Sequence, residues 1–400
     1  MVSPDKAITR DTKLIPSYCV HLDAARALAA LVVFLGHGVA LCLHINVHDQ
    51  INSRLNQAPA EGLPFNPAEH THMGHQAVIV FFVLSGFLVG GGAIRALKNR
   101  RWSTKLYLLQ RATRLWVVLI PALLLVALLD TIGSRFFSSS IRIYATLRSP
   151  VLTSVWNVIP IHFSASTFAG NLFFLQGILV PYFGSDCPLW SLSYEFWYYI
   201  MFPVLLVVIL PSSKMPRRIF SVVALIAMLI FCGRQISIYF LIWMMGAVTS
   251  CMPNGILQAT ARRLAPWMCL FYAFFNLYVV VRPFNLLASD FITGLLFSVV
   301  LWLLLHLREP VGESLYRNVS TKLSAMSYTL YCVHYPIILL LSAWLAPRLS
   351  QQNRMQSAAL LLIVYAAAFI TADLFYRCFE ANTGCIRRFF AVRLGFQSVG

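Results

Sequence analysis

Long apolar stretches, separated by short polar segments, recur along almost the whole chain. A helix that crosses the hydrocarbon layer of a bilayer needs about 20 apolar residues, and most of these stretches have about that length. The pattern therefore predicts an all-α fold, that of a polytopic integral membrane protein with about ten transmembrane helices. We expect them near residues 22–44, 77–97, 113–131, 190–210, 217–232, 236–252, 264–281, 286–306, 324–346 and 357–379.

One apolar run, from Asn171 to Pro181, is only eleven residues long. Because that length cannot cross a bilayer as a helix, we expect a re-entrant or interfacial segment there. When this run does not cross, the basic clusters of the chain fall on the same side as the basic N-terminal segment, which the positive-inside rule assigns to the cytoplasm. The predicted organisation is a cytoplasmic segment 1–21, a membrane domain 22–380 and a cytoplasmic tail 381–400.

Composition agrees with a membrane protein, since 59% of the 400 residues are hydrophobic and 11% are charged. The net charge of +17 lies in short segments between apolar runs, which is how charges that set topology are distributed. No soluble region remains to form a basic groove, so nucleic acid is excluded as a partner.

The polar segment 45–76 is predicted to be an external loop, because it contains three prolines and several acidic residues. His70, His72 and His75 lie in it at a spacing that suits a metal ion. No nearby cysteine completes a site, so we expect solvated histidines and no bound metal.

The first apolar run contains an arginine and a histidine, which are costly inside a membrane helix and usually mark a cavity or a site. Arg26 and His37 are eleven positions apart. At about 100° and 1.5 Å per residue they fall on one face, roughly 16 Å apart in depth. Asp23 is placed to pair with Arg26. This stretch alone leaves a structural interpretation open, in which the arginine extends to the interface and the histidine is hydrogen-bonded in the core.

Polar residues in three further helices are also candidates. Glu195 lies inside the run that begins at 190, with Ser191 four residues earlier on the same face, and such a carboxylate needs a partner or water. Arg111 and Arg114 project from one side of a helix entrance, either as a topology anchor or as a phosphate-binding fork. Ser85 precedes Gly86 and Gly90, whose four-residue spacing favours close helix packing.

The run 324–346 carries a polar and aromatic stripe. Tyr328, Tyr331 and His334 recur every three residues, and Pro336 removes a helical N–H beside the histidine. A stripe of this kind occurs more often in a core than in a site, so the histidine alone leaves both roles open.

Taken in order, these motifs resemble the acyltransferase 3 family of integral membrane acyltransferases. The resemblance rests on R-x10-H at 26–37, F-F-V-L-S-G-F-L at 81–88, R-x-x-R at 111–114, N-L-F-F-L-Q at 171–176, W-S-L-x-x-E at 190–195 and S-Y-x-x-Y-x-x-H-x-P at 327–336. It implies an enzyme of a bacterial inner membrane that O-acylates cell-surface polysaccharides or related acceptors.

The resemblance and the chemistry of the residues together assign roles. The donor is expected to be a cytosolic acyl-CoA, most simply acetyl-CoA, and no permanently bound cofactor is expected. A polyanionic donor suits guanidinium groups, and an imidazole suits removal of a proton from an acceptor hydroxyl. The expected residues are catalytic His37, Glu195 and His334, donor-binding Arg26, Arg111 and Arg114, and substrate-binding Ser85, Ser191 and Tyr331.

Two alternatives remain open at this level. Buried ionisable residues also mark transporters and exporters, although no inverted repeat supports that class here. Within the enzyme class, His37 either activates the acceptor directly or activates Ser85 as a covalent nucleophile. The sequence predicts neither the acceptor's identity nor the oligomeric state.

Overall fold

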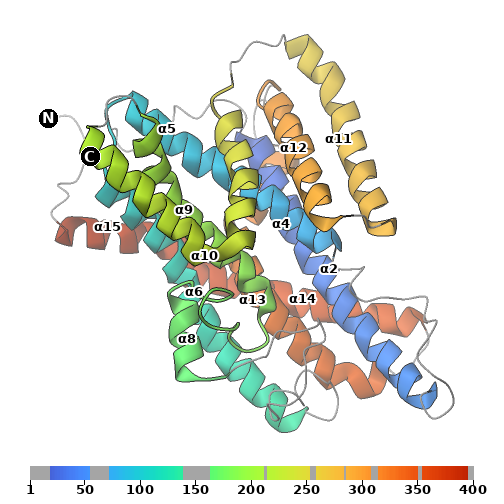
Figure 1. The fold of residues 1–400 in the computed structure, drawn as a ribbon. Coiled ribbons are helices and arrows are strands. Elements are labelled where there is room, and N and C mark those ends of the chain that lie inside the picture. The colour runs from blue at the N-terminus through green and yellow to red at the C-terminus, as the bar shows by residue number, and fades with distance from the viewer. Residues whose placement is uncertain are drawn as a thin grey trace, which may run out of the picture.

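The structure is a computed structural model that describes residues 19–54, 72–137, 163–210, 214–252, 258–282, 285–307, 314–349 and 354–394. Within those residues every regular element is a helix (Figure 1). The longer elements are α2 (Cys19–Arg54), α4 (His72–Ser85), α5 (Gly91–Lys98), α6 (Thr104–Phe136), α8 (Ala165–Leu172), α9 (Trp190–Ile209), α10 (Met215–Thr249), α11 (Gln258–Val281), α12 (Leu286–Leu304), α13 (Leu315–Leu349), α14 (Arg354–Cys378) and α15 (Thr383–Arg393).

The described residues contain nine helical stretches that are long and apolar enough to cross a membrane, which confirms the polytopic fold. One of them, α10, combines the two helices expected at 217–232 and 236–252. Gly233 separates its two arms with φ 79° and ψ 173°, a conformation that side-chain-bearing residues rarely adopt. Figure 1 shows the arms meeting at a sharp angle. Counted as arms, they give the ten expected helices.

The centre of the bundle is α13, which packs along α2 and also contacts α6 and α14. On the other side of α2, α4 packs against α10 and α12. Large apolar side chains on the outer faces of α10, α11 and α14 are exposed, among them Phe220, Trp267 and Leu362. These apolar faces are suited to contact with lipid. Helix α13 instead carries buried serine, threonine and histidine side chains, and polar groups buried within a membrane bundle commonly mark a functional site.

The glycines of the second predicted span do allow close packing. A Cβ atom on Gly86 would overlap the carbonyl oxygen of Trp243 in α10, and one on Gly246 would overlap the carbonyl oxygen of Val83. Gly86–Gly90 forms a single turn of π-helix between α4 and α5. Such a bulge is common at functional sites, because it changes the direction of the side chains that follow.

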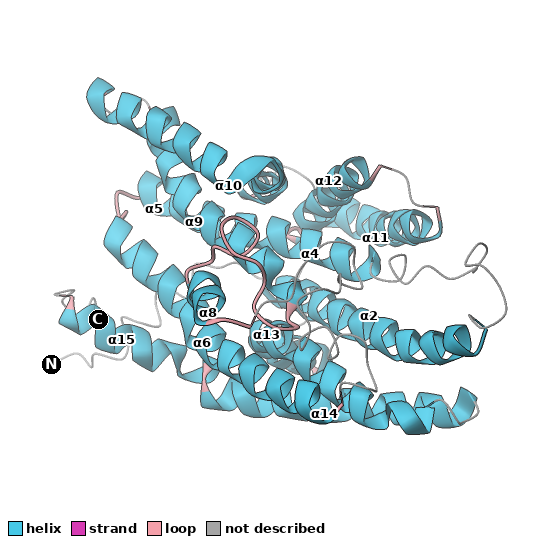
Figure 2. Ribbon diagram, turned by 60° about the horizontal axis from the view of Figure 1, so that its bottom comes forward, coloured by secondary structure: helices cyan, strands magenta, loops and turns pink. Residues whose placement is uncertain are grey.

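The segment predicted not to cross is a short helix followed by a folded loop. Helix α8 has eight residues, too few to span. The side chain of Asn171 then holds the loop, because its Nδ2 donates to the Pro181 carbonyl (2.9 Å) and its Oδ1 accepts from the Phe183 amide (3.2 Å). Ser185 donates both its amide and its hydroxyl to Asp130 of α6 (2.6 and 2.8 Å). Figure 2 shows this loop beside α8.

The structure corrects the loop predicted at 45–76. Helix α2 continues to Arg54 and α4 begins at His72, so His75 lies within a helix and not in a solvated loop. His70 lies outside the described residues, and the side chain of His72 is not described. Residues 45–54 and 72–76 resemble a loop because they are mostly polar, but they contain no proline and are helical.

Candidate functional site

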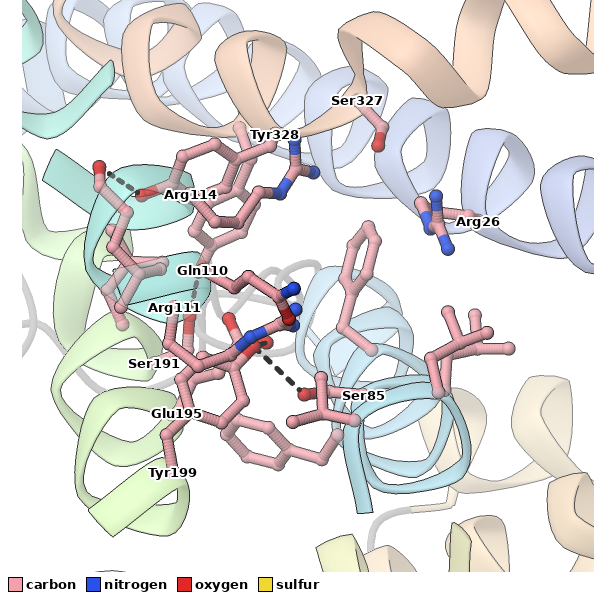
Figure 3. A pocket seen from close by; sticks show the side chains of 18 of the residues that line it. Arg26, Ser85, Gln110, Arg111, Arg114, Ser191, Glu195, Tyr199, Ser327 and Tyr328 are labelled. Carbon is pink, nitrogen blue, oxygen red and sulfur yellow. Dashed lines mark hydrogen bonds between the residues drawn. The ribbon is translucent and has the colours of Figure 1, made fainter. Parts of the chain in front are cut away.

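A cavity of about 450 Å³ lies between α2, α4, α6, α9, α13 and α15. Four arginines line it, Arg26, Arg111, Arg114 and Arg387, and Glu195 is the one carboxylate among its described lining residues. Figure 3 shows Arg26 entering from α2 and Arg111 and Arg114 entering from the opposite side. The excess of cations makes this cavity, named the arginine cavity below, suitable for a polyanionic ligand.

Arg26 is held in place by a hydroxyl on α13. Its Nη1 donates to Ser324 Oγ (3.1 Å), and Ser324 Oγ donates to Asp23 Oδ1 (2.9 Å). The direct distance from Arg26 to Asp23 is 3.8 Å, so the predicted pairing is present. This network orients the guanidinium and leaves it at the cavity wall.

Arg111 and Arg114, the predicted fork, have different partners. Arg114 forms an ion pair with Glu380, which is buried and also accepts from the Thr329 amide (3.0 Å) and hydroxyl (2.6 Å). Its guanidinium lies 4.9 Å from the centre of the Tyr328 ring. Arg111 Nε is buried and has no hydrogen-bond partner within the described part of the chain. Arg111 is therefore the fork member with unused donor capacity.

Ser85 and Glu195 belong to one hydrogen-bonded chain on the wall of the arginine cavity. Tyr199 donates to Glu195 Oε1, Ser85 Oγ lies 3.2 Å from the Tyr199 hydroxyl, and Trp243 Nε1 donates to Ser85 Oγ (3.0 Å). Since Tyr199 donates to Glu195, Ser85 donates to Tyr199 and accepts from Trp243. The serine hydroxyl is fully engaged in this arrangement.

His37 lines a second, smaller cavity of about 220 Å³, which we call the histidine cavity. It lies 2.8 Å, Nδ1 to Nε2, from His334 of α13, and the two rings stack with centroids 5.2 Å apart. No local sequence pattern indicates this contact, because 297 positions separate the two residues.

The hydrogen bonds of His334 fix which nitrogen of His37 carries a proton. His334 Nδ1 lies 2.9 Å from the carbonyl oxygens of Leu330 and Tyr331, which can only accept, so Nδ1 carries the hydrogen and Nε2 is an acceptor. His37 must then donate from Nδ1, which leaves a lone pair on its Nε2. A Cβ atom placed on Gly74, another lining residue, would lie 3.8 Å from that Nε2. The basic nitrogen therefore faces the histidine cavity.

Comparison with known proteins adds the class of reaction. A family model described as an acyltransferase domain matches residues 20–377. The chain belongs to the acyltransferase 3 family. This membrane acyltransferase is also similar to the peptidoglycan O-acetyltransferase OatA of Listeria monocytogenes, with 23% identity over 405 residues. The match covers 93% of this chain but 56% of that relative, so the chain spans little more than half of the relative's length. No solved structure matches the chain.

In this acyltransferase one residue, Tyr331, lines both cavities. Its hydroxyl donates to the Pro188 carbonyl (2.5 Å) and lies 2.6 Å from Ser191 Oγ. Pro188 lines the histidine cavity, whereas Ser191 lines the arginine cavity. Tyr331 therefore stands at the boundary between them, and its hydroxyl is bonded to a residue of each.

The predicted site residues divide between these two spaces. Arg26, Arg111, Arg114, Ser85, Ser191 and Glu195 line the arginine cavity, and His37 lines the histidine cavity, with His334 directly behind it. Glu195, predicted to be catalytic together with His37 and His334, lines the arginine cavity and not the histidine cavity. Ser85 also lines the arginine cavity, whereas His37 does not.

Sequence reasoning missed Arg387, which reaches the arginine cavity from α15. Its place in a basic tail indicates only membrane topology, and the packing of α15 against α6 has no local sequence signal. It also missed Tyr182, Trp190 and Tyr335, which give the histidine cavity aromatic walls.

Two groups beside the histidine cavity, outside the spanning segments, have raised pKa values. Burial, reinforced by the neighbouring Cys187, raises the pKa of Tyr182 to about 12, so its hydroxyl keeps its proton at neutral pH. Burial also raises the pKa of Asp186 well above its ordinary value, and Asp130 raises it further. Tyr182 can thus donate a hydrogen bond to a ligand in the cavity.

Proposed function

We propose that this membrane acyltransferase transfers an acetyl group from acetyl-CoA in the arginine cavity to a hydroxyl group of an acceptor in the histidine cavity. The observation that carries the proposal is the hydrogen-bond chain that leaves the Nε2 lone pair of His37 facing the histidine cavity, next to a cavity lined by four arginines.

The arginine cavity has the chemistry that coenzyme A requires. Arg26, Arg111, Arg114 and Arg387 supply guanidinium donors for the phosphates of the nucleotide portion. Arg111 Nε has no other partner among the described residues, so it gains a hydrogen bond when a phosphate binds. The pantetheine arm would then extend toward Tyr331, the residue shared with the histidine cavity.

In the transfer step His37 acts as general base. Its Nε2 takes the proton of the acceptor hydroxyl while the oxygen forms a bond to the thioester carbon. The carbon–sulfur bond then breaks, and the CoA thiolate leaves and takes the proton from His37. His334 stabilises the transient imidazolium, because its Nε2 accepts the hydrogen bond from His37 Nδ1.

The acceptor is proposed to be a saccharide hydroxyl, by analogy with the relative whose name gives peptidoglycan as its substrate. Aromatic side chains line the histidine cavity and supply apolar faces against which a sugar ring can pack. Glu195 has no place in this acceptor site. We assign it to the donor side, where it orients Tyr199 and limits the positive charge.

The proposed orientation puts the donor cavity on the cytoplasmic side. Arg111 lies seven residues after the start of α6, or about 10 Å along the helix axis. The connection before α6 carries Lys98, Arg100 and Arg101, the kind of basic segment that stays in the cytoplasm. Acetyl-CoA would therefore enter from the cytosol, and both termini would lie inside.

Radiolabelled acetyl-CoA tests this function. Membranes that contain the protein should move label from acetyl-CoA into base-labile esters of envelope polymers, and membranes lacking it should not. We expect the Ser85→Ala variant to keep the transfer, because direct attack requires no acyl-serine. Label trapped on wild-type protein but absent from Ser85→Ala would contradict direct transfer, and no label in any polymer would contradict the proposed function.

A further inference from the structure

A second imidazole lines the histidine cavity. His75 of α4 is one of its lining residues, together with His37. His75 Nε2 lies 2.9 Å from Asp290 Oδ2 of α12, and the hydroxyl of Tyr239 from α10 donates to the same oxygen. The side chain of Asp290 is fully buried, whereas that of His75 is 22% exposed. Asp290 thus anchors the pair inside the protein, and His75 lies at the wall of the histidine cavity.

Two aromatic side chains hold the ring of His75 in place. It stacks on the indole of Trp190, with ring centroids 5.7 Å apart and planes 18° apart, and meets Tyr239 edge-on. Because carboxylates only accept, His75 donates from Nε2 to Asp290, and its acceptor lone pair lies on Nδ1 in the neutral ring. No hydrogen bond to Nδ1 is present in the described part of the molecule. That nitrogen is the one available to a ligand.

A purely structural tie between α4 and α12 does not account for this arrangement. Asp290 Oδ1 is buried and has no partner among the described residues, so the carboxylate is under-satisfied, and burying it would be an expensive way to join two helices. A carboxylate behind a cavity-facing imidazole is instead the arrangement that fixes a tautomer for binding or chemistry. His37, by contrast, has another imidazole behind it.

We propose that His75, oriented by Asp290, binds the acceptor, accepting a hydrogen bond through Nδ1 from a second hydroxyl close to the one that His37 deprotonates. Two imidazoles from adjacent helices then hold a polyol, such as a sugar ring with neighbouring hydroxyls, between them. This inference rests on the proposed function. His75 contacts the acceptor, and Asp290 is a positioning residue that acts through His75.

If His75 binds the acceptor, transfer of the acetyl group to a polyol depends on His75. Hydrolysis of acetyl-CoA by water does not depend on it. Water needs the base His37 but presents no second hydroxyl for His75 to hold. Replacing His75 should therefore change the ratio of transfer to hydrolysis, which general damage to the fold would not do.

The variants His75→Gln and His75→Phe separate binding from folding. Glutamine places its amide nitrogen where Nε2 was and keeps the bond to Asp290, but has no equivalent of Nδ1. Phenylalanine keeps the stack on Trp190 and loses both nitrogens. His306→Phe is the matched control, since His306 bonds to the Trp302 carbonyl and lines neither cavity. Asp290→Asn tests the positioning role.

Three quantities are measured for each variant: base-labile acetate on envelope polymers of cells with equal protein levels, CoA released from acetyl-CoA by purified protein without acceptor, and the acetyl-CoA dissociation constant. We expect His75→Gln and His75→Phe to lower polymer acetate about tenfold or more, the effect of one lost hydrogen bond, with CoA release and donor affinity within about twofold of wild type. Asp290→Asn should shift the ratio in the same direction, and His306→Phe should not.

Wild-type polymer acetate in both His75 variants would overturn the proposal. An equal fall of polymer acetate and CoA release would also overturn it, because His75 would then act on the chemistry or the fold instead of on the acceptor. If the wild-type protein itself neither binds acetyl-CoA nor acetylates polymers, the proposed function fails first, and that outcome is distinct from a failure of His75 alone.

Discussion

At the scale of single residues, the site is built from contacts between helices: His37 of α2 meets His334 of α13, and Arg114 of α6 pairs with Glu380. The eleven-residue spacing of Arg26 and His37 placed both on one helix face, and the structure has each at a cavity wall. The contact of His37 with His334 and the pairing of Arg114 with Glu380 join residues hundreds of positions apart. Such contacts depend on how helices pack, so the roles that follow from them could not be predicted from local patterns.

The unequal partners of the two fork arginines give a residue-scale prediction. Arg111→Lys should weaken acetyl-CoA binding about tenfold with an unchanged melting temperature, because lysine keeps the charge but loses the planar fork. Arg114→Lys should lower both the acetyl-CoA affinity and the melting temperature, since it also disturbs the buried Glu380. Arg95→Lys, at an exposed position outside both cavities, is the control. Unchanged donor affinity in Arg111→Lys, measured calorimetrically in detergent, would return this arginine to the role of a topology anchor.

At the scale of elements, hydropathy and length predicted nearly every helix, because each long apolar run has one stable form in a bilayer. The errors lie at the ends. Helix α2 extends to Arg54, and α4 begins early enough to bring His75 to the histidine cavity. Helix α15 lies within the predicted cytoplasmic tail 381–400, and its basic residues do not indicate that Arg387 lines the arginine cavity. The π-turn at Gly86–Gly90 leaves no signal that distinguishes it from an ordinary glycine pair.

The packing of α4 against α10 gives an element-scale prediction. Gly86→Ala should destabilise the protein by about 1–3 kcal/mol, because the added methyl group meets the backbone carbonyl of Trp243, which cannot move as a side chain would. Gly92→Ala is a matched control six residues away, where a Cβ atom has no neighbour within 4 Å. The measurement is thermal unfolding of both variants in one detergent. Equal melting temperatures would show that the close contact contributes nothing to stability.

At the scale of the whole molecule, Tyr331 lies on the walls of two cavities that differ in chemistry, one lined by arginines and the other by histidines and aromatic side chains. Fold class and enzyme class followed from sequence, since motifs spread over most of the chain pointed to one family. The division into an arginine cavity and a histidine cavity did not, because it depends on the mutual placement of α2, α4, α9 and α13. Because of that division Glu195, expected from the sequence to be catalytic, is assigned to the donor side.

Orientation in the membrane is a prediction at this scale. In a cysteine-free background, Asn99→Cys, before α6, should react with membrane-impermeant maleimide only after permeabilisation, whereas Ala165→Cys, at the start of α8, should react in intact spheroplasts. Both positions are exposed in the structure, so access depends only on the side of the membrane. Labelling of Asn99→Cys from outside would place the donor cavity on the wrong face for cytosolic acetyl-CoA.

In the proposed function, arginines bind the donor in one cavity while His37 performs the chemistry from the other. This division of roles is tested most directly by measuring acetyl-CoA affinity and acetyl transfer together in purified His37→Ala protein. We predict a dissociation constant within about twofold of wild type and a loss of transfer of about 10²–10⁴, the contribution typical of a general base. Transfer that survives in this variant, or donor affinity that falls in parallel with transfer, would contradict this division of roles between the arginines and His37.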